Sequence, residues 1–384
     1  MTATSSTGRC DTKFARVKEA FAVVLARPFE LGAAVAVFVD GRPVVDLWGG
    51  WVDAKKTRPW AEDTVVNVFS TTKGLLALGV HRLVEEGRVD LDAPVARVWP
   101  ELDPRITLRM ILAHRAGLPA VRAPLPPEAL FDWGAMTAAL AAQEPWWEPG
   151  TAHGYHAVTF GWLLGEVVRR VTGKMPREYL AEAITGPLAA DFQIGLRPAD
   201  EERCADLRPT RREPGVETLF DRIARDPESM TAKAFVNPPT MVLPGTVSSR
   251  PWRDADLPSV NGHATARGIA RIYGAVARGG ELDGVRILSP ESIARCQAEQ
   301  SRGEDRILGV PTRFSLGFML PQPTHDPFAA EGAFGHPGAG GSMGFADPEA
   351  RLSFGFVMNR SGNEILSDPR VRALSEAVYA SLRA

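Results

Sequence analysis

Apolar residues form strand-like runs near both ends of this chain. Two largely apolar runs, residues 33–39 and 43–48, flank Asp40-Gly41, which is a two-residue turn signal. This pattern predicts a β-hairpin near the start of the chain. Further strands are expected just before Ser70, over 313–320, in a segment ending at His336, and over 352–358, where apolar residues alternate.

Helical spacing of apolar residues dominates the middle of the chain. The strongest stripe follows Ser70 and ends at Gly87, and extra leucines widen it, so we expect a helix buried nearly all round. Residues 200–255 are rich in charge and proline, and we expect an irregular segment with one or two helices. Other helices are expected over 11–26 (capped by Asp11), 107–113, 133–142, 156–171, 265–277, 290–298 and 368–382.

This order of elements predicts an α+β fold. One antiparallel sheet is expected from both chain ends, flanked by helices, with a helical domain inserted between them. We therefore expect a mixed domain formed by residues 1–69 and 256–384, and a mostly helical domain over 70–255.

Composition excludes several classes of function. The 384 residues are 45% hydrophobic and 23% charged, with a net charge of −2, which favours neither nucleic acid nor an anionic membrane as partner. The chain has no apolar run of about 20 residues, and its start is polar, so a cytoplasmic location is expected. Three scattered cysteines suggest neither disulfides nor a zinc site. The sequence also contains no glycine-rich phosphate-binding loop, so no cofactor is expected.

Ser70 and Lys73 are the strongest catalytic candidates. Their spacing places a hydroxyl and an amine one turn apart on the same helix face. A serine hydroxyl becomes nucleophilic when a neighbour takes its proton. Lysine serves as that base only if burial lowers its pKa from about 10.4, and an apolar helix provides such burial. The alternative is that Ser70 caps the helix and Lys73 is solvated.

Tyr155 and a glycine-rich stretch over 335–344 are further candidates. Tyr155 follows a turn and precedes a buried helix, so its hydroxyl can reach a cleft and move a proton, although a core tyrosine is the alternative. The glycines would let main-chain N–H groups bind an oxyanion, unless they form a plain turn.

Two other motifs have weaker support. Ser342 lies in Gly-x-Ser-x-Gly, which resembles a nucleophile elbow, but a turn and a strand follow it where an elbow requires a helix. His153 and His156 could suggest a metal, but no third ligand stands at a useful spacing, so no metal site is expected.

The ordered motifs resemble the serine β-lactamase and penicillin-binding-protein superfamily, and more narrowly the family VIII carboxylesterases. Ser70-Thr71-Thr72-Lys73 matches the first motif. Tyr155-His156-Ala157 stands where β-lactamases carry Tyr-x-Asn, and His336-Pro337-Gly338 stands where they carry Lys-Thr-Gly. The resemblance implies a β-lactamase/transpeptidase-like fold with its site between the two domains.

The resemblance also implies residue roles. Ser70 would be acylated, Lys73 and Tyr155 would move protons, and the N–H groups of Ser70 and Ala339 would bind the oxyanion. His336 and Gly338 would contact substrate. No cofactor is implied, and the oligomeric state cannot be read from the motifs.

Departures from the β-lactamase pattern affect the substrate. Ala157 replaces the asparagine that binds the substrate amide, and His336 replaces the lysine that holds the substrate carboxylate. Both changes favour uncharged, short-chain esters over β-lactams, with weak β-lactamase activity as a side reaction. We therefore expect a serine carboxylesterase acting on a small-molecule ester. The alternatives are an acyltransferase using the same acyl-enzyme, and a catalytically silent ligand-binding protein.

Overall fold

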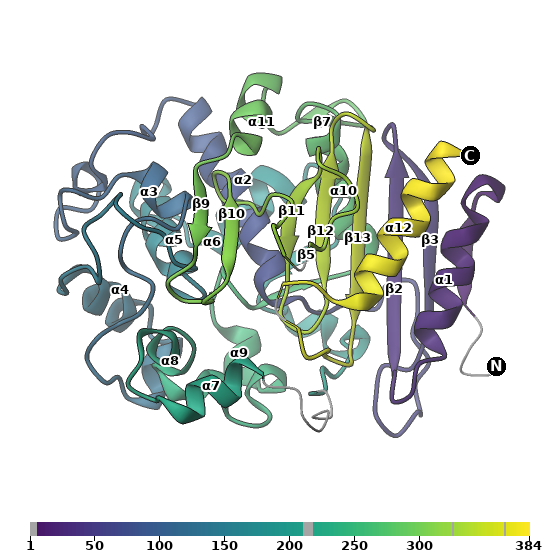
Figure 1. Ribbon diagram of the computed structural model, residues 1–384, viewed down its shortest axis with the longest axis horizontal. Helices are drawn as coiled ribbons and strands as arrows, with labels where there is room; N and C mark the ends of the chain where they lie inside the picture. Colours follow the sequence, from purple (N-terminus) through teal and green to yellow (C-terminus); the bar gives the residue numbers. More distant parts are fainter. Residues whose placement is uncertain (1–5, 210–217, 325, 365) are drawn as a thin grey trace.

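A six-stranded antiparallel sheet forms one side of the molecule, and its strands lie in the order β1-β3-β2-β13-β12-β11 (Figure 1). The computed structural model describes residues 6–209, 218–324, 326–364 and 366–384. The predicted sheet from both chain ends is confirmed, because β2 pairs directly with β13. The strands are β1 (Thr7–Cys10), β2 (Gly32–Val39), β3 (Arg42–Gly50), β11 (Phe334–Pro337), β12 (Met343–Asp347) and β13 (Leu352–Met358).

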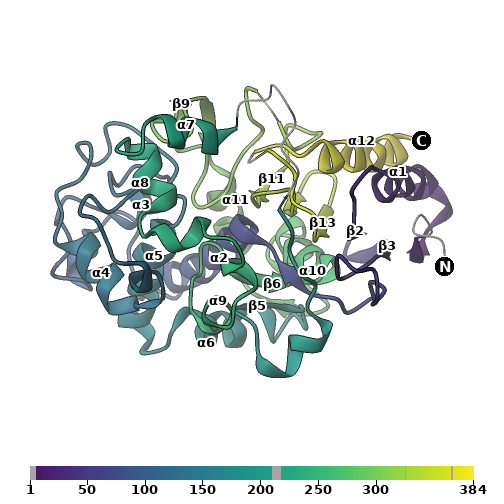
Figure 2. The same ribbon diagram turned by 90° about the horizontal axis from the view of Figure 1, so that it is seen from below.

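The first hairpin forms as its turn residues require. Asp40 and Gly41 have φ angles of 52° and 78°, and two successive positive angles match the twist of paired strands. Every residue of β2 except Val39 is buried, since helices cover both faces of the sheet. Figure 2 shows α10 (Ala266–Ala277) on one face, and α1 (Ala15–Leu25) and α12 (Pro369–Arg383) on the other.

Helix α2 (Thr72–Glu85) lies between this sheet and the helical side of the molecule (Figure 1). Eleven of its fourteen residues are buried, which confirms the prediction of a helix buried nearly all round. Gly79 allows close packing, because a Cβ there would lie 2.4 Å from Leu180 Cδ2. The neighbouring helices are α3 (Leu108–Leu112), α4 (Trp133–Ala141), α5 (Thr159–Thr172) and α6 (Pro176–Leu180).

Shorter elements complete the fold. The three-stranded sheet of β4 (Val66–Asn67), β6 (Gly262–Ala264) and β5 (Phe192–Ile194) lies beside α2, and β9 (Ser301–Glu304) and β10 (Pro311–Phe314) form a hairpin. The others are β7 (Glu281–Leu282), β8 (Val285–Arg286), α7 (Leu219–Arg225), α8 (Met230–Val236), α9 (Arg250–Asp254) and α11 (Pro290–Gln297).

Several predicted boundaries were wrong. The first helix begins at Ala15 after a 3₁₀ turn, and Asp11 makes no side-chain cap but accepts hydrogen bonds from Arg9. The helix expected from 156 begins at Thr159, and the strand expected over 313–320 ends at Phe314. Strand β1 was missed, since its residues are polar and largely exposed. The segment 200–255 contains α7, α8 and α9, although 210–217 lie outside the described residues.

The two predicted domains share one hydrophobic core. The largest cluster of buried apolar residues includes Phe160 from the predicted helical part and Phe354 from the predicted mixed part. The division at residues 69 and 255 therefore stays a prediction. Within the described ranges, every helix is too short or too polar to cross a lipid bilayer.

Arg370 at the start of α12 is the first target for a stability test. This buried guanidinium lies 2.8 Å from Glu30 and 2.7 Å from Asp368, and it also donates to Gly340 O at 2.7 Å. Arg370→Met would leave two buried carboxylates without their cation, so we expect it to lower the free energy of unfolding by about 3–5 kcal/mol. Urea unfolding measures this, with the exposed Arg372→Met as control; equal midpoints for the two variants would contradict it.

Candidate active site

Ser70 lies on a tight turn between β4 and α2. Residues Phe69–Thr71 form a single 3₁₀ turn, and the α-helix begins at Thr72. Phe69 has a φ of 42°, a left-handed value that is costly for a bulky residue and typical of functional turns. Ser70 is the N-cap of neither helix, so the capping interpretation is wrong. Its side chain is only half-buried, which leaves the hydroxyl accessible to a substrate.

The Lys73 amine is fully buried and lies against Ser70. Lys73 Nζ is 3.0 Å from Ser70 Oγ, and it donates to Ala157 O at 2.6 Å and to Ser259 O at 3.2 Å. Among the described residues, no carboxylate forms an ion pair with it. Burial lowers the pKa of Lys73 well below its ordinary value. The solvated interpretation of Lys73 is therefore wrong, and the amine is available as a base.

Tyr155 completes this cluster from the loop before α5. Its hydroxyl shares a side-chain hydrogen bond with Ser70, and Lys73 Nζ lies 5.0 Å from the centre of its ring. The ring is buried, stacks on Phe314 at 6.1 Å, and meets His114 edge-on at 5.1 Å. Burial raises the pKa of Tyr155, and the hydrogen bond with Ser70 opposes this rise. The phenol is therefore a proton donor at neutral pH.

The glycine-rich stretch lies against the Ser70 turn. A Cβ on Gly338 would lie 2.1 Å from Ser342 Oγ and 2.2 Å from Val68 O, so only glycine fits this approach. Ala339, which follows, is half-buried, and its N–H has no hydrogen-bond acceptor among the described residues. This N–H is therefore free to bind an oxyanion.

Ser342 does not form a nucleophile elbow. It is buried in the connection between the antiparallel strands β11 and β12, and a strand follows it at Met343. Its hydroxyl donates to Val68 O at 2.7 Å and lies 3.1 Å from Thr71 Oγ1. Ser342 thus fastens the glycine-rich stretch to the turn that carries Ser70.

The close approach at Gly338 is testable by adding one methyl group. We expect Gly338→Ala to push the stretch away from the Ser70 turn, to cost about 1–3 kcal/mol of stability, and to lower kcat at least tenfold. The control is Gly134→Ala in α4, where the nearest atom to a new Cβ lies 3.4 Å away. Thermal melts and ester hydrolysis measure both variants. A Gly338→Ala enzyme with the kcat of the control would contradict the required contact.

His336 is a neutral, buried histidine beside Tyr155. Its Nδ1 lies 2.7 Å from Pro337 O and donates to it, and its Nε2 has no hydrogen-bond partner among the described residues. The ring lies 6.0 Å from the Tyr155 ring. Burial and the nearby Lys73 lower the pKa of His336 to about 3. His336 therefore supplies no positive charge at neutral pH.

His153 and His156 are held by protein groups. His156 Nδ1 donates to Gly154 O at 2.7 Å, and Nε2 accepts from the Leu118 N–H at 3.2 Å, so both ring nitrogens are occupied. His153 Nε2 lies 2.9 Å from Thr312 Oγ1. Within the described part of the chain, no three His, Cys, Asp or Glu side chains come together as a metal site would require.

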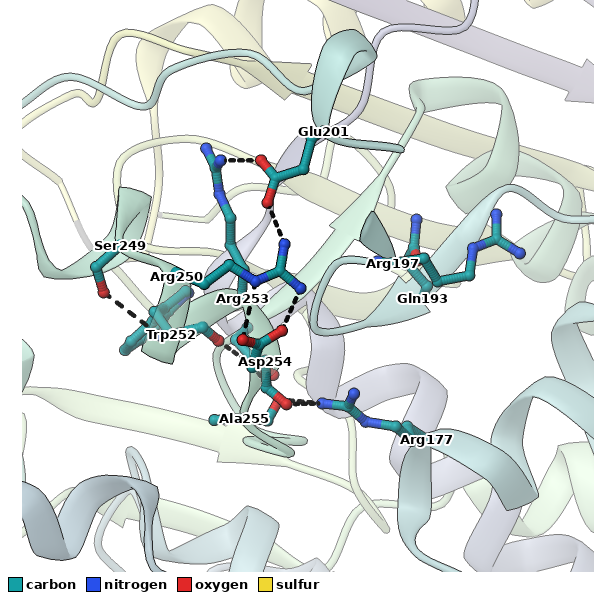
Figure 3. A network of polar contacts seen from close by, with 11 residues as sticks. Arg177, Gln193, Arg197, Glu201, Ser249, Arg250, Trp252, Arg253, Asp254 and Ala255 are labelled. Atoms are coloured by element: carbon teal, nitrogen blue, oxygen red, sulfur yellow. Dashed lines mark hydrogen bonds and ion pairs between the residues drawn. The ribbon is translucent and has the colours of Figure 1, made fainter. Parts of the chain in front are cut away.

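Ser259 was missed in the sequence, because a main-chain carbonyl leaves no motif. The segment that carries it follows α9, which a polar network fixes in place (Figure 3). In this network, Arg250 Nε donates to Asp254 at 2.8 Å, and Arg250 and Arg253 both bind Glu201. Arg177 donates to the carbonyl of Asp254 at 2.6 Å. These bonds tie the segment before Ser259 to α6 and to Glu201.

The fold is that of a class of serine hydrolases related to the β-lactamases. The chain belongs to the beta-lactamase family, whose model matches residues 20–377. The predicted β-lactamase/transpeptidase-like α+β fold is confirmed by this match and by similar solved structures.

Similar proteins carry esterase and penicillin-binding names. "Esterase/beta-lactamase LipL" of Mycobacterium tuberculosis is 37% identical over 377 residues, covering 92% of this chain and 82% of that protein. The crystal structure of a family VIII carboxylesterase is 39% identical, with a TM-score of 0.88 and coverage of 98% of this chain and 100% of that one. A penicillin-binding protein homologue from Caulobacter crescentus is 40% identical, with a TM-score of 0.87 over 98% and 100%. The predicted resemblance to family VIII carboxylesterases is confirmed.

Proposed function

We propose that this protein is a serine carboxylesterase that hydrolyses short-chain esters through an acyl-enzyme on Ser70. The names of two similar proteins, an esterase/beta-lactamase and a family VIII carboxylesterase, support ester hydrolysis. The observation that carries the mechanism is the uncharged environment of Lys73, 3.0 Å from Ser70 Oγ.

Acylation begins with the Ser70 hydroxyl. Two carbonyl groups, of Ala157 and Ser259, accept the two N–H bonds of a neutral amine. The remaining lone pair of Lys73 then faces Ser70 Oγ and takes its proton as the oxygen attacks the ester carbonyl. The developing oxyanion is stabilised by the N–H groups of Ser70 and Ala339.

Tyr155 carries the proton onward. Its phenol, hydrogen-bonded to Ser70, passes a proton to the departing alcohol and is reprotonated from Lys73. The ester C–O bond breaks, and the acyl group stays on Ser70. In deacylation a water molecule gives its proton to the same pair and attacks the acyl carbon, which releases the acid and restores the Ser70 hydroxyl.

The substrate-binding residues favour uncharged esters. His336 stays neutral at physiological pH, because burial lowers its pKa to about 3, so it offers no cation for a substrate carboxylate. Gly338 lets the substrate lie against the Ala339 N–H, and the Ala157 side chain has no amide for a β-lactam side chain. Efficient β-lactam turnover is therefore not expected.

Substrate comparison tests this proposal. We expect p-nitrophenyl acetate and butyrate to be hydrolysed with kcat/KM at least 10²-fold above that for nitrocefin, because the site holds no carboxylate partner. Hydrolysis of p-nitrophenyl octanoate in the same assay measures whether the site also accepts a longer acyl chain. Nitrocefin turnover equal to ester turnover would assign the protein to the β-lactamases instead.

Two alternatives use the same site. An acyltransferase would pass the acyl group from Ser70 to an alcohol or amine, and product analysis with added acceptors separates it from a hydrolase. The second alternative is a ligand-binding protein without catalytic activity, and one similar structure is named a penicillin-binding protein homologue. Failure of a fluorophosphonate to label the protein would favour this second alternative. The cytoplasmic location and the absence of nucleic acid partners, cofactors and metals stay predictions, and the oligomeric state stays open.

A further inference from the structure

Asp305, in the turn of the β9–β10 hairpin, is bound to the main chain of Tyr155. Its two carboxylate oxygens accept the Tyr155 N–H at 3.0 and 3.1 Å, across 150 residues of sequence. The same carboxylate accepts the N–H groups of Ile307 and Leu308, both at 2.9 Å, and the Thr312 hydroxyl at 3.3 Å. Asp305 thus joins its own hairpin turn to the loop that carries Tyr155.

The Asp305 side chain is fully buried, yet it forms no ion pair with any described Lys, Arg or His. A buried carboxylate without a cation is costly, and main-chain N–H donors are what compensate for it. Thr312 Oγ1, which donates to Asp305, also lies 2.9 Å from His153 Nε2, so the hydrogen bonds lead from Asp305 through Thr312 to a titratable histidine. The three main-chain N–H groups that this side chain accepts, from Tyr155, Ile307 and Leu308, show that its oxygens hold the backbone in place.

The hairpin also holds the Tyr155 ring. Phe314, the last residue of β10, stacks on that ring with an angle of only 4° between the planes. The hairpin turn itself is anchored, because the Arg306 N–H donates to His153 O at 3.1 Å and Thr231 donates to Ile307 O at 2.8 Å. Main chain and ring of Tyr155 are therefore both fixed by one hairpin, which is itself attached to α8.

We propose that Asp305 is a positioning residue of the esterase, holding the Tyr155 main chain so that the phenol stays beside Ser70 and Lys73 during acylation. This inference rests on the proposed function. The charge acts in the same direction, since Asp305, after burial, raises the pKa of Tyr155 and so keeps the phenol protonated. Asp305 itself touches no reacting atom.

The test compares Asp305→Ala, Asp305→Asn and a matched control in the full chain. Asp305→Ala removes every acceptor, so we expect kcat for p-nitrophenyl butyrate to fall about 10- to 100-fold with KM changed less than threefold. Asp305→Asn keeps one oxygen for the N–H groups and should recover kcat to within about fivefold of wild type. The control is Asp347→Ala at the last residue of β12, a buried carboxylate that accepts the Ala350 N–H and the Tyr379 hydroxyl and makes no contact with the Tyr155 loop among the hydrogen bonds of the described residues.

The control separates positioning from folding. Asp347→Ala should lose stability but keep the wild-type kcat when measured well below its melting temperature. A kcat for Asp305→Ala within threefold of this control would overturn the proposal. If Asp305→Ala does not fold, Asp305→Glu decides: it keeps the charge but displaces the oxygens, so a wild-type kcat there would equally overturn it. Ser70→Ala tests the proposed function separately from this inference. It must be inactive whether or not the Asp305 variants lose activity, and an active Ser70→Ala enzyme would overturn the proposed function itself.

Discussion

Ser70→Ala is expected to lower ester hydrolysis by roughly 10³- to 10⁶-fold, because it removes the serine hydroxyl that is hydrogen-bonded to the Lys73 amine. The change removes one oxygen from a half-buried position, so the fold and the melting temperature should stay close to wild type. Hydrolysis of p-nitrophenyl butyrate measures the loss, and mass spectrometry after fluorophosphonate treatment measures the covalent adduct. Both signals should vanish together.

Ser342→Ala is the matched control for the nucleophile. Ser342 Oγ binds Val68 O and not a base, so we expect activity within about tenfold of wild type and an intact adduct. Some loss is expected, because the Val68 carbonyl then keeps only the Thr71 N–H as donor, at a cost of about 0.5–1.5 kcal/mol. An inactive Ser342→Ala enzyme beside an active Ser70→Ala enzyme would transfer the nucleophile to Ser342.

Lys73→Met should lower kcat/KM by about 10²- to 10⁴-fold, the usual contribution of a general base. Methionine keeps the apolar stem but cannot take the Ser70 proton. In the wild-type enzyme, activity should rise with pH as Lys73 loses its proton and then level off. Because burial lowers the pKa of Lys73, this rise should lie well below the ordinary lysine value of about 10.4.

The pH profile is the decisive measurement for Lys73. The rise to a plateau should be absent in Lys73→Met, whose residual activity should increase only in proportion to the hydroxide concentration, without levelling off. Lys233→Met, which removes a half-buried lysine that donates to Arg122 O on the surface, is the control and should keep the full profile. A Lys73→Met enzyme that retains the rise would show that another group is the base.

Local patterns were enough to predict much of the fold. The Asp40-Gly41 turn, the buried stripe of α2 and the alternating strand at 352–358 each depend on residues a few positions apart. The errors lie where distant contacts decide. Strand β1 is polar and forms only because β3 offers it an edge, and the strand from 313 ends at Phe314 because the chain turns there to pair Met319 with Gly335.

Sequence alone thus determined the spacing of Ser70 and Lys73 and the order of the three motifs, because both are properties of neighbouring residues. It could not determine the protonation state of Lys73, which depends on burial of the amine in the folded chain, where it meets the carbonyls of Ala157 and Ser259, 84 and 186 residues away. Nor could it find the Asp305–Tyr155 contact, which joins two loops separated by 150 residues. These features follow from tertiary packing, since only the folded chain excludes water from an amine and brings a carboxylate to a distant N–H group.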